Sequence, residues 1–283
     1  MLFTLCNFLW NSLWLFYRIF GKISHPISQS FVFRTTTEAV TIIIVPTFWD
    51  NYSYIVTSGS DAIVIDPSQS EPIFREIKKR KLHLSAIVVT HEHVDHVAGI
   101  RKLAKKCGAP IYVPDGATIP GKAIHITDGY TLQLGALSLK AVFVPGHFAF
   151  PYPLASLNRN IAWYCAQEGL LFTGDTLFSC GYGYTARGHE DAMSESLKLL
   201  RSFPDDTKIF SGHEYSLRLT ESVAGVFPDN KALIERLSEV RRLLASNKPT
   251  VPTTMGLEKA INPWLRWDDE NCLRILKFSR LHP

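Results

Sequence analysis

Short, β-branched apolar runs follow one another from residue 40 to about residue 209. Each run ends at glycine, proline, aspartate or asparagine, which is the pattern of strands separated by turns. The predicted strands are Val40–Val45, Tyr52–Thr57, Ala62–Ile65, Ala86–Val89, Ile111–Val113, Thr131–Leu134, Leu137–Val144, Ile161–Tyr164 and Leu170–Phe172. Apolar residues at helical spacing among charged ones predict helices at Glu71–Lys81, Val97–Cys107 and Asp191–Ser202.

Beyond residue 213 the apolar positions take helical spacing. A segment that starts near Asp229 or Asn230 has one apolar face, with Glu and Arg on the other side, and Pro249 ends it. Strands with covering helices, followed by helices alone, predict an α+β protein: an αβ sandwich with a small C-terminal helical domain. We expect a leader over residues 1–37, the sandwich over residues 38–216 and the helical domain over residues 217–283.

Composition narrows the class of protein. The 283 residues are 46% hydrophobic and 20% charged, as in globular proteins. Lys and Arg outnumber Asp and Glu by 30 to 26, but three basic residues precede Glu38, the first acidic residue, so the body carries a net charge of only +1. A near-neutral body predicts no nucleic-acid partner. Five cysteines without paired spacing exclude a disulfide scaffold and a C-x-x-C zinc site.

The first twenty residues, MLFTLCNFLWNSLWLFYRIF, are apolar and aromatic, with no charge before Arg18. A spanning helix needs about 17–25 apolar residues, so this segment is at the short limit. Because Lys and Arg lie on its C-terminal side, a spanning segment would leave the body in the cytosol. A polar stripe also fits an interfacial helix, and the lack of acidic residues fits a mitochondrial import segment. We expect membrane attachment with a cytosolic body, with a mitochondrial location or packing onto the body as alternatives.

Four side chains able to bind metal lie within six residues of one another, directly after a predicted buried strand. They are His91, His93, Asp95 and His96, in the segment THEHVDH. At a strand end followed by a tight loop, the first two can point one way and the last two another. One motif can then serve two neighbouring ions, and its imidazoles and carboxylate suit divalent metals.

Three further residues of the same kind follow other predicted strands. His147 comes after Pro-Gly, Asp175 lies in FTGDTLF, and His213 lies in SGHEY. Any one of them alone would ordinarily be a cap or a turn residue. A glycine before each ligand-type side chain allows the chain to turn, and the repetition of this pattern predicts that they join the THEHVDH segment in one metal centre.

At these residues the sequence resembles the metallo-β-lactamase superfamily and, within it, the glyoxalase II (hydroxyacylglutathione hydrolase) family, from about Val40 to Arg266. The shared motifs are DNY at 50–52, VIDP at 64–67, THEHVDH, TGDTLF and GHEY. The C-terminal motifs PDN at 228–230, KPTVPTT at 248–254 and NPWLR at 262–266 are typical of the glyoxalase II branch. The resemblance implies a four-layer αββα sandwich followed by a small helical domain.

The resemblance also implies two metal sites and a reaction. One ion would be bound by His91, His93 and His147, the second by Asp95, His96 and His213, and Asp175 would bridge them. Two divalent ions, zinc first with iron or manganese as alternatives, would activate a water molecule. Asp95 and Asp175 would orient it toward a small-molecule thioester, and the family reaction converts S-2-hydroxyacylglutathione to glutathione and a 2-hydroxy acid.

The glutathione site departs from the family pattern. The family has a basic residue and a tyrosine after the bridging aspartate, where a gap-free count places Tyr184 and Ala186, and neither supplies a cation. Tyr215 matches a family contact to glutathione. Phe148-Ala149-Phe150-Pro151 stands where the family has Thr-x-Gly-His, which makes the wall beside the metals apolar. We expect Tyr184, Tyr215 and Phe148 to contact the substrate and the hold on glutathione to be weakened.

Other functions fit parts of this pattern. A persulfide dioxygenase-like enzyme would use one iron bound by two His and one Asp, and the complete second ligand set argues against it. A nuclease is disfavoured by the near-neutral body. A membrane-tethered scaffold with low turnover would keep the fold and the metals, and the altered substrate wall favours it.

Overall fold

The computed structural model describes residues 25–119, 121–135, 137–147, 159–185, 188–266, 269–270 and 272. The apolar segment 1–20 lies outside the described residues, as do Phe148 and Ala186. Among the residues that the structure describes, none of the helices is long and apolar enough to cross a bilayer.

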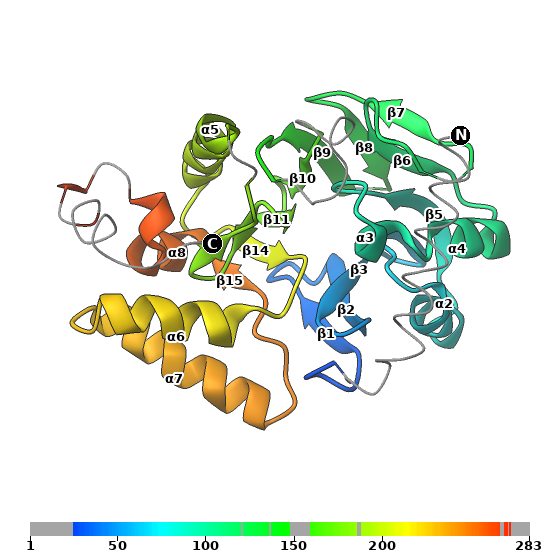
Figure 1. The fold of residues 1–283 in the computed structure, drawn as a ribbon. Helices are drawn as coiled ribbons and strands as arrows, with labels where there is room; N and C mark the ends of the chain where they lie inside the picture. Colours follow the sequence, from blue (N-terminus) through cyan, green and yellow to red (C-terminus); the bar gives the residue numbers. More distant parts are fainter. Residues whose placement is uncertain are drawn as a thin grey trace, which may run out of the picture.

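The N-terminal half forms a seven-stranded sheet whose strands follow chain order (Figure 1). The first four strands pair antiparallel and the last four pair parallel. The strands are β1 (Phe31–Arg34), β2 (Val40–Thr47), β3 (Asn51–Ser58), β4 (Asp61–Ile65), β5 (His83–Val88), β6 (Ile111–Pro114) and β7 (Ile124–Ile126). The β-branched residues of β2 to β5 are buried on both faces of the sheet, which explains their nearly continuous apolar runs.

The second sheet has six strands in the order β15-β14-β11-β10-β9-β8. Only β11 and β14 pair parallel in it, and a two-stranded ribbon of β12 and β13 lies beside the site described below. The strands are β8 (Thr131–Leu134), β9 (Leu137–Phe143), β10 (Ile161–Cys165), β11 (Leu170–Gly174), β12 (Leu177–Phe178), β13 (Gly181–Tyr182), β14 (Lys208–Ser211) and β15 (Thr253–Thr254).

The two sheets pack face to face, and helices cover their outer faces. The core between the sheets joins Val56 and Ile63 of the first sheet to Trp163, Phe172 and Phe210 of the second. The helices α2 (Ser70–Lys79) and α4 (Ile100–Cys107) cover the outside of the first sheet, while α5 (Glu190–Arg201) covers the second. These layers confirm the predicted four-layer αββα sandwich.

The C-terminal part is mostly helical, as predicted. The helices α6 (Ser216–Val226), α7 (Lys231–Ala245) and α8 (Met255–Ile261) share a small core with the 3-10 helix η1 (Pro263–Leu265). Asn230 caps α7, because its side chain accepts a hydrogen bond from the backbone N–H of Leu233. Strand β15 lies between these helices and pairs with β14, so this part also extends the second sheet.

Several local features differ from the sequence-based expectation. The helix predicted over residues 97–107 is confirmed as α4, but α4 begins later, at Ile100; Val97 ends a separate short helix, α3 (Val94–Val97), and Gly99 lies between the two. A Cβ atom at Gly99 would lie 2.5 Å from the carbonyl oxygen of Pro67, so the chain approaches too closely there for a side chain. Six short strands were not predicted: β1, β7, β12, β13, β14 and β15. Strand β1 lies inside the segment 1–37 assigned to the leader, and it pairs with β2.

Candidate metal centre

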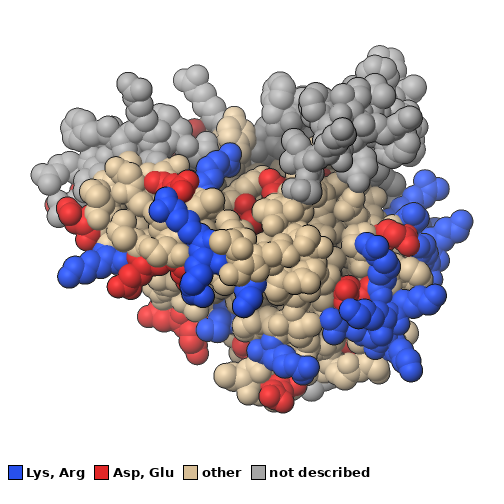
Figure 2. All heavy atoms as spheres, turned by 90° about the horizontal axis from the view of Figure 1, so that it is seen from below, with Lys and Arg blue, Asp and Glu red and all other residues tan. Residues whose placement is uncertain are grey.

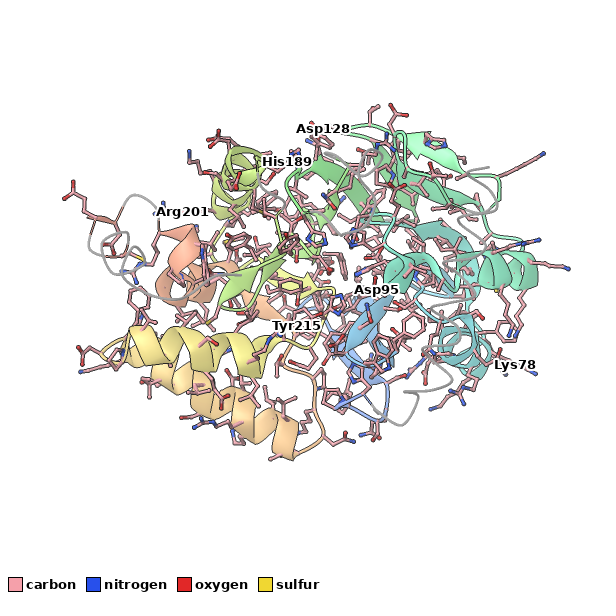
Figure 3. The ribbon with its side chains drawn as sticks, in the orientation of Figure 1. Lys78, Asp95, Asp128, His189, Arg201 and Tyr215 are labelled. Carbon is pink, nitrogen blue, oxygen red and sulfur yellow. The ribbon has the colours of Figure 1, made fainter. Side chains whose placement is uncertain are left out.

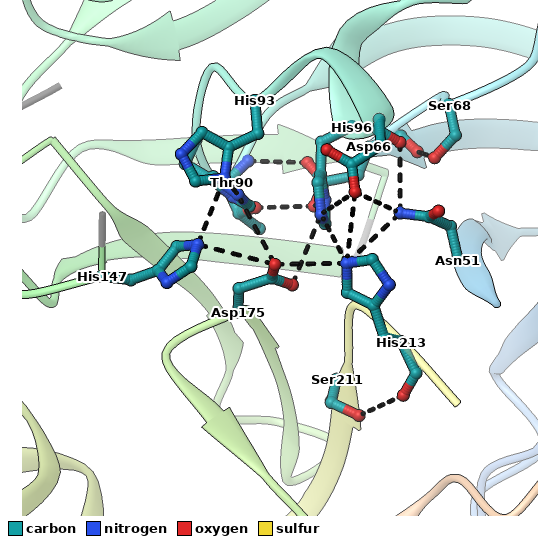
Figure 4. A network of polar contacts seen from close by, with 12 residues as sticks. Asn51, Asp66, Ser68, Thr90, His93, His96, His147, Asp175, Ser211 and His213 are labelled. Carbon is teal, nitrogen blue, oxygen red and sulfur yellow. Dashed lines mark hydrogen bonds and ion pairs between the residues drawn. The ribbon is translucent and has the colours of Figure 1, made fainter. Parts of the chain in front are cut away.

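The predicted ligands converge where strands of both sheets end (Figure 4). His91 and His93 lie in the loop after β5, and Asp95 and His96 lie on α3. Hydrogen bonds from β10 hold this loop: the backbone N–H of Ile161 donates to Thr90 O at 2.9 Å, and Trp163 Nε1 donates to Val89 O at 3.2 Å. The remaining ligands follow β9, β11 and β14 and are His147, Asp175 and His213.

Three imidazoles and one carboxylate form the first group. His93 Nδ1 lies 2.9 Å from His91 Nε2 and 3.2 Å from His147 Nε2. Asp175 Oδ2 lies 3.9 Å from His91 Nε2 and 3.6 Å from His147 Nε2. Three nitrogen atoms and one oxygen facing a common point form the donor set of a divalent metal.

The second group is built in the same way on the other side of Asp175. His213 Nε2 lies 3.3 Å from Asp95 Oδ2 and 3.3 Å from His96 Nε2. The carboxylate of Asp175 reaches both imidazoles, with Oδ1 3.4 Å from His96 Nε2 and Oδ2 3.2 Å from His213 Nε2. Asp175 is therefore shared by both groups, which is the placement expected of a bridging ligand.

Asp175 itself indicates that a cation belongs here. Its side chain is 9% exposed, and Oδ1 is buried without a hydrogen-bond partner among the described residues. A buried carboxylate oxygen that lacks a hydrogen bond is costly unless a cation satisfies it. Gly212 leaves room for this oxygen, since a Cβ atom there would lie 2.3 Å from it. The residues present fit a pair of divalent ions.

In four of the histidines, a partner outside the centre contacts the ring nitrogen that faces away from it. His213 Nδ1 contacts Asp50 Oδ1 at 2.8 Å, His96 Nδ1 contacts Asp66 Oδ2 at 2.9 Å, and His147 Nδ1 donates to the Tyr184 carbonyl at 2.9 Å. Such contacts fix the tautomer that leaves Nε2 free as a ligand. Asp66 also accepts hydrogen bonds from the backbone and hydroxyl of Thr90, and that hydroxyl contacts His91 Nδ1 at 2.9 Å.

The charges differ between the two groups. Burial lowers the pKa of His93 to about 3, and it also lowers the pKa values of His91 and His147. Burial alone would lower the pKa of His96 too, but the carboxylates of Asp175 and Asp95 outweigh it and raise that pKa to about 10. The first group thus presents neutral imidazoles, whereas the carboxylates around His96 favour the positively charged form of its ring.

Of the residues predicted to contact substrate, Tyr215 lies against a metal ligand, whereas Tyr184 is exposed. The Tyr215 ring stacks on His213, with centroids 4.6 Å apart and an angle of 11° between the rings, so it lies beside the second group (Figure 3). The Tyr184 side chain is 55% exposed, while its backbone carbonyl supports His147. Arg218, which was not predicted to contact substrate, has its guanidinium carbon 5.0 Å from the centre of the Tyr215 ring.

The residues that support the ligands were not predicted either. Asp50, Asn51 and Asp66 belong to motifs shared with the glyoxalase II family, but their partners are 30 to 163 positions away in the chain. Asn51 Nδ2 donates to Asp95 Oδ2 at 3.0 Å. The available signal was their position, directly before or after a predicted strand.

Comparisons with known proteins agree with this geometry. The family described as Metallo-beta-lactamase superfamily matches residues 46–149, and the family described as Hydroxyacylglutathione hydrolase C-terminus matches residues 214–280. A solved structure, the BLEG-1 B3 metallo-beta-lactamase, superposes with a TM-score of 0.57 at 20% identity, over 80% of this chain and 99% of that one. The fold is therefore that of the metallo-β-lactamases.

Two sequence relatives define the branch. A hydroxyacylglutathione hydrolase of Nitrosomonas europaea is 38% identical over 80% of this chain and 83% of its own length. Another, of Chromohalobacter salexigens, is 37% identical over 84% of this chain and 91% of its own length. The chain belongs to the hydroxyacylglutathione hydrolase, or glyoxalase II, family.

Proposed function

We propose that the protein is a metal-dependent hydrolase that cleaves S-2-hydroxyacylglutathione, or a related thioester, into a thiol and a carboxylic acid. The observation that carries this proposal is the pair of ligand groups that share the buried carboxylate of Asp175. The family membership supports the same reaction, since the relatives named above are hydroxyacylglutathione hydrolases.

In this proposal each group holds one divalent ion, zinc first with iron or manganese as alternatives. The first ion is bound by His91, His93 and His147, the second by Asp95, His96 and His213, and both by Asp175. Bound ions would lower the pKa of a water molecule toward neutrality and polarise the thioester carbonyl. The carboxylate of Asp95 accepts a hydrogen bond from Asn51, and the Asp95 side chain is 34% exposed. This carboxylate can therefore orient a water molecule that reaches the site from solvent.

The substrate contacts are proposed from the surroundings of the metal centre and from the sequence. The Tyr215 ring stacks on His213, and Arg218 adds a cation next to the Tyr215 ring. We assign Tyr215, Tyr184 and Phe148 to the substrate, with Arg218 as a partner for a substrate carboxylate. Because Tyr184 stands where the family has a basic residue, we expect a higher KM for glutathione thioesters than in the family at large.

Two other functions receive less support. A persulfide dioxygenase-like enzyme needs one iron site, whereas this chain brings a full second set of ligands to within 4.8 Å of one another. A tethered scaffold with low turnover would keep the same metal ligands and their partners, but the relatives described above are named as hydrolases.

The location of the protein is a separate proposal. We propose attachment to a membrane through residues 1–20, with the body in the cytosol and mitochondrial import as the alternative. The support is the apolar sequence of that segment and the absence of acidic residues before Glu38. Deleting residues 1–24 should release the protein into the soluble fraction, and a full-length protein that is already soluble would refute the attachment.

The test of the enzymatic proposal combines metal analysis with an assay. Full-length protein supplied with zinc should contain about two ions per chain and should hydrolyse S-lactoylglutathione or another thioester. His213→Ala should abolish turnover and remove one ion. His125→Ala serves as the matched control, because His125 is an exposed histidine of strand β7 and belongs to neither ligand group. Protein that holds two ions yet cleaves no thioester in a panel of glutathione and other thioesters would favour the scaffold.

A further inference from the structure

The outer face made by α2, the turn after it and α4 is strongly basic. We call residues 70–81 and 100–107 the basic face. It carries nine Lys and Arg against two Glu, and all nine basic residues are exposed. They are Arg75, Lys78, Lys79, Arg80, Lys81, Arg101, Lys102, Lys105 and Lys106. Figure 2 shows Lys and Arg gathered at one side of the molecule.

The acidic residues of this face neutralise only part of its charge. Glu71 Oε2 lies 2.8 Å from Lys106 Nζ and 3.7 Å from Lys102 Nζ, and Glu76 pairs with Arg80 at 2.9 Å. Within the described part of the chain, the other six basic residues form no ion pair. The face thus has a net charge of +7, whereas eighteen basic and twenty-four acidic residues elsewhere after residue 37 give −6. Positive charge is therefore concentrated on one face of a body whose net charge is close to zero.

We propose that the basic face docks on an anionic phospholipid surface. Lys and Arg near such a surface each contribute about 1 kcal/mol of attraction, and the effect decays within a Debye length. The rest of the body, which has a net negative charge, would be repelled from the same surface. The uneven distribution of charge therefore orients the protein on the surface as well as attracting the protein to it. Six of the nine basic residues are Lys, compact charges that suit a fluid array of headgroups.

The N-terminal sequence favours a lipid over a nucleic acid as the partner. The chain begins with an apolar segment at the short limit for a membrane span, followed by basic and no acidic residues up to Glu38. One weak membrane signal binds only marginally, and stable attachment takes two, such as an apolar anchor with a basic patch. A nucleic acid would make no use of the apolar segment. The basic face supplies the second signal.

The test uses the full-length chain and vesicles of two compositions. Lys78→Gln, Lys79→Gln, Arg101→Gln and Lys105→Gln are combined in one variant, since none of these residues forms an ion pair in the described structure. The matched control combines four exposed basic residues from other faces, Lys122→Gln, Lys140→Gln, Lys231→Gln and Arg242→Gln. Co-sedimentation is measured with phosphatidylcholine vesicles and with vesicles containing about one third phosphatidylserine.

Each basic residue removed should lower the partition coefficient onto the anionic vesicles about fivefold. The variant with four substitutions on the basic face should therefore partition at least about a hundredfold more weakly than the wild type. Its binding to neutral vesicles, which depends on the apolar segment, should stay at the wild-type level, as should its thioesterase activity. Wild-type protein that does not distinguish the two vesicles, or a control variant that loses as much as the face variant, would overturn the proposal. Duplex DNA or RNA is added as a competitor at the same salt concentration. If the protein binds the nucleic acid more tightly than the anionic vesicles and leaves them, the proposal is wrong and the partner is a nucleic acid.

Discussion

Replacing Asp50 by Asn should weaken one metal site and spare the other. The Asp50 carboxylate contacts His213 Nδ1 at 2.8 Å, and His213 belongs only to the second ligand group. Asn has nearly the same shape and can still accept a hydrogen bond, but it carries no charge. The ring keeps its orientation while losing the charge that makes Nε2 a stronger ligand.

The expected loss of metal affinity depends on the kind of contact between Asp50 and His213 and on its exposure to solvent. Loss of such an outer partner typically costs 10–100-fold in metal affinity. Asp50 is 33% exposed, although His213 is only 5% exposed, so solvent already screens part of the interaction. We therefore expect about a tenfold rise in the Kd of the second ion, close to 1.4 kcal/mol, with less than about a threefold change for the first.

The assay is a competition titration of the apoprotein with zinc and a chromophoric chelator, which resolves the two dissociation constants. Asp61→Asn is the matched control, because Asp61 contacts His83 at 3.0 Å on the exposed surface, away from the metal ligands. Equal weakening of both ions by Asp50→Asn, or no weakening of either, would refute the assignment of His213 to a separate second site.

Three further predictions concern other parts of the molecule. Asp175→Ala should lose both ions together in elemental analysis, and retention of one would mean that this residue does not bridge. Tyr184→Lys should lower the KM for S-lactoylglutathione by roughly tenfold with little change in kcat, because a charge-assisted bond contributes about 1.5–3 kcal/mol; an unchanged KM would place the carboxylate contact elsewhere. Burial lowers the pKa of His25 from 6.5 to about 4, so the unfolded chain binds the proton more readily. The unfolding free energy should therefore fall as the pH drops from 6.5 toward 4, and denaturant titrations should show a smaller fall in His25→Gln; an identical fall would show that other groups dominate.

Much of the fold could be predicted because secondary structure depends on local periodicity. The β-branched runs of β2, β3 and β4 and the apolar face of α7 were identified within a few residues, since their pattern repeats over short distances. The short strand β15, with two residues, has too little pattern to detect. It forms because β14 offers an edge, and that edge exists only in the folded chain. The break at Gly99 likewise depends on a contact with Pro67, 32 positions away.

The seven predicted metal ligands were recognisable because each follows a strand and is a His or an Asp in a glycine-containing turn or the THEHVDH segment. What the sequence determined by itself is therefore the type of chemistry and the local turns that present it. The family resemblance implied that Asp175 is shared, but local spacing could not show it, since only the meeting of β11, β14 and the loop after β5 puts Asp175 between both groups. The tertiary structure also decided the charge distribution, because the net charge of +1 after residue 37 does not reveal that α2 and α4 lie side by side and, with the turn after α2, expose nine cations. The physical reason is the same in both cases: distances between residues far apart in sequence are set by the packing of sheets and helices, whereas turns and periodicity are set by neighbouring residues.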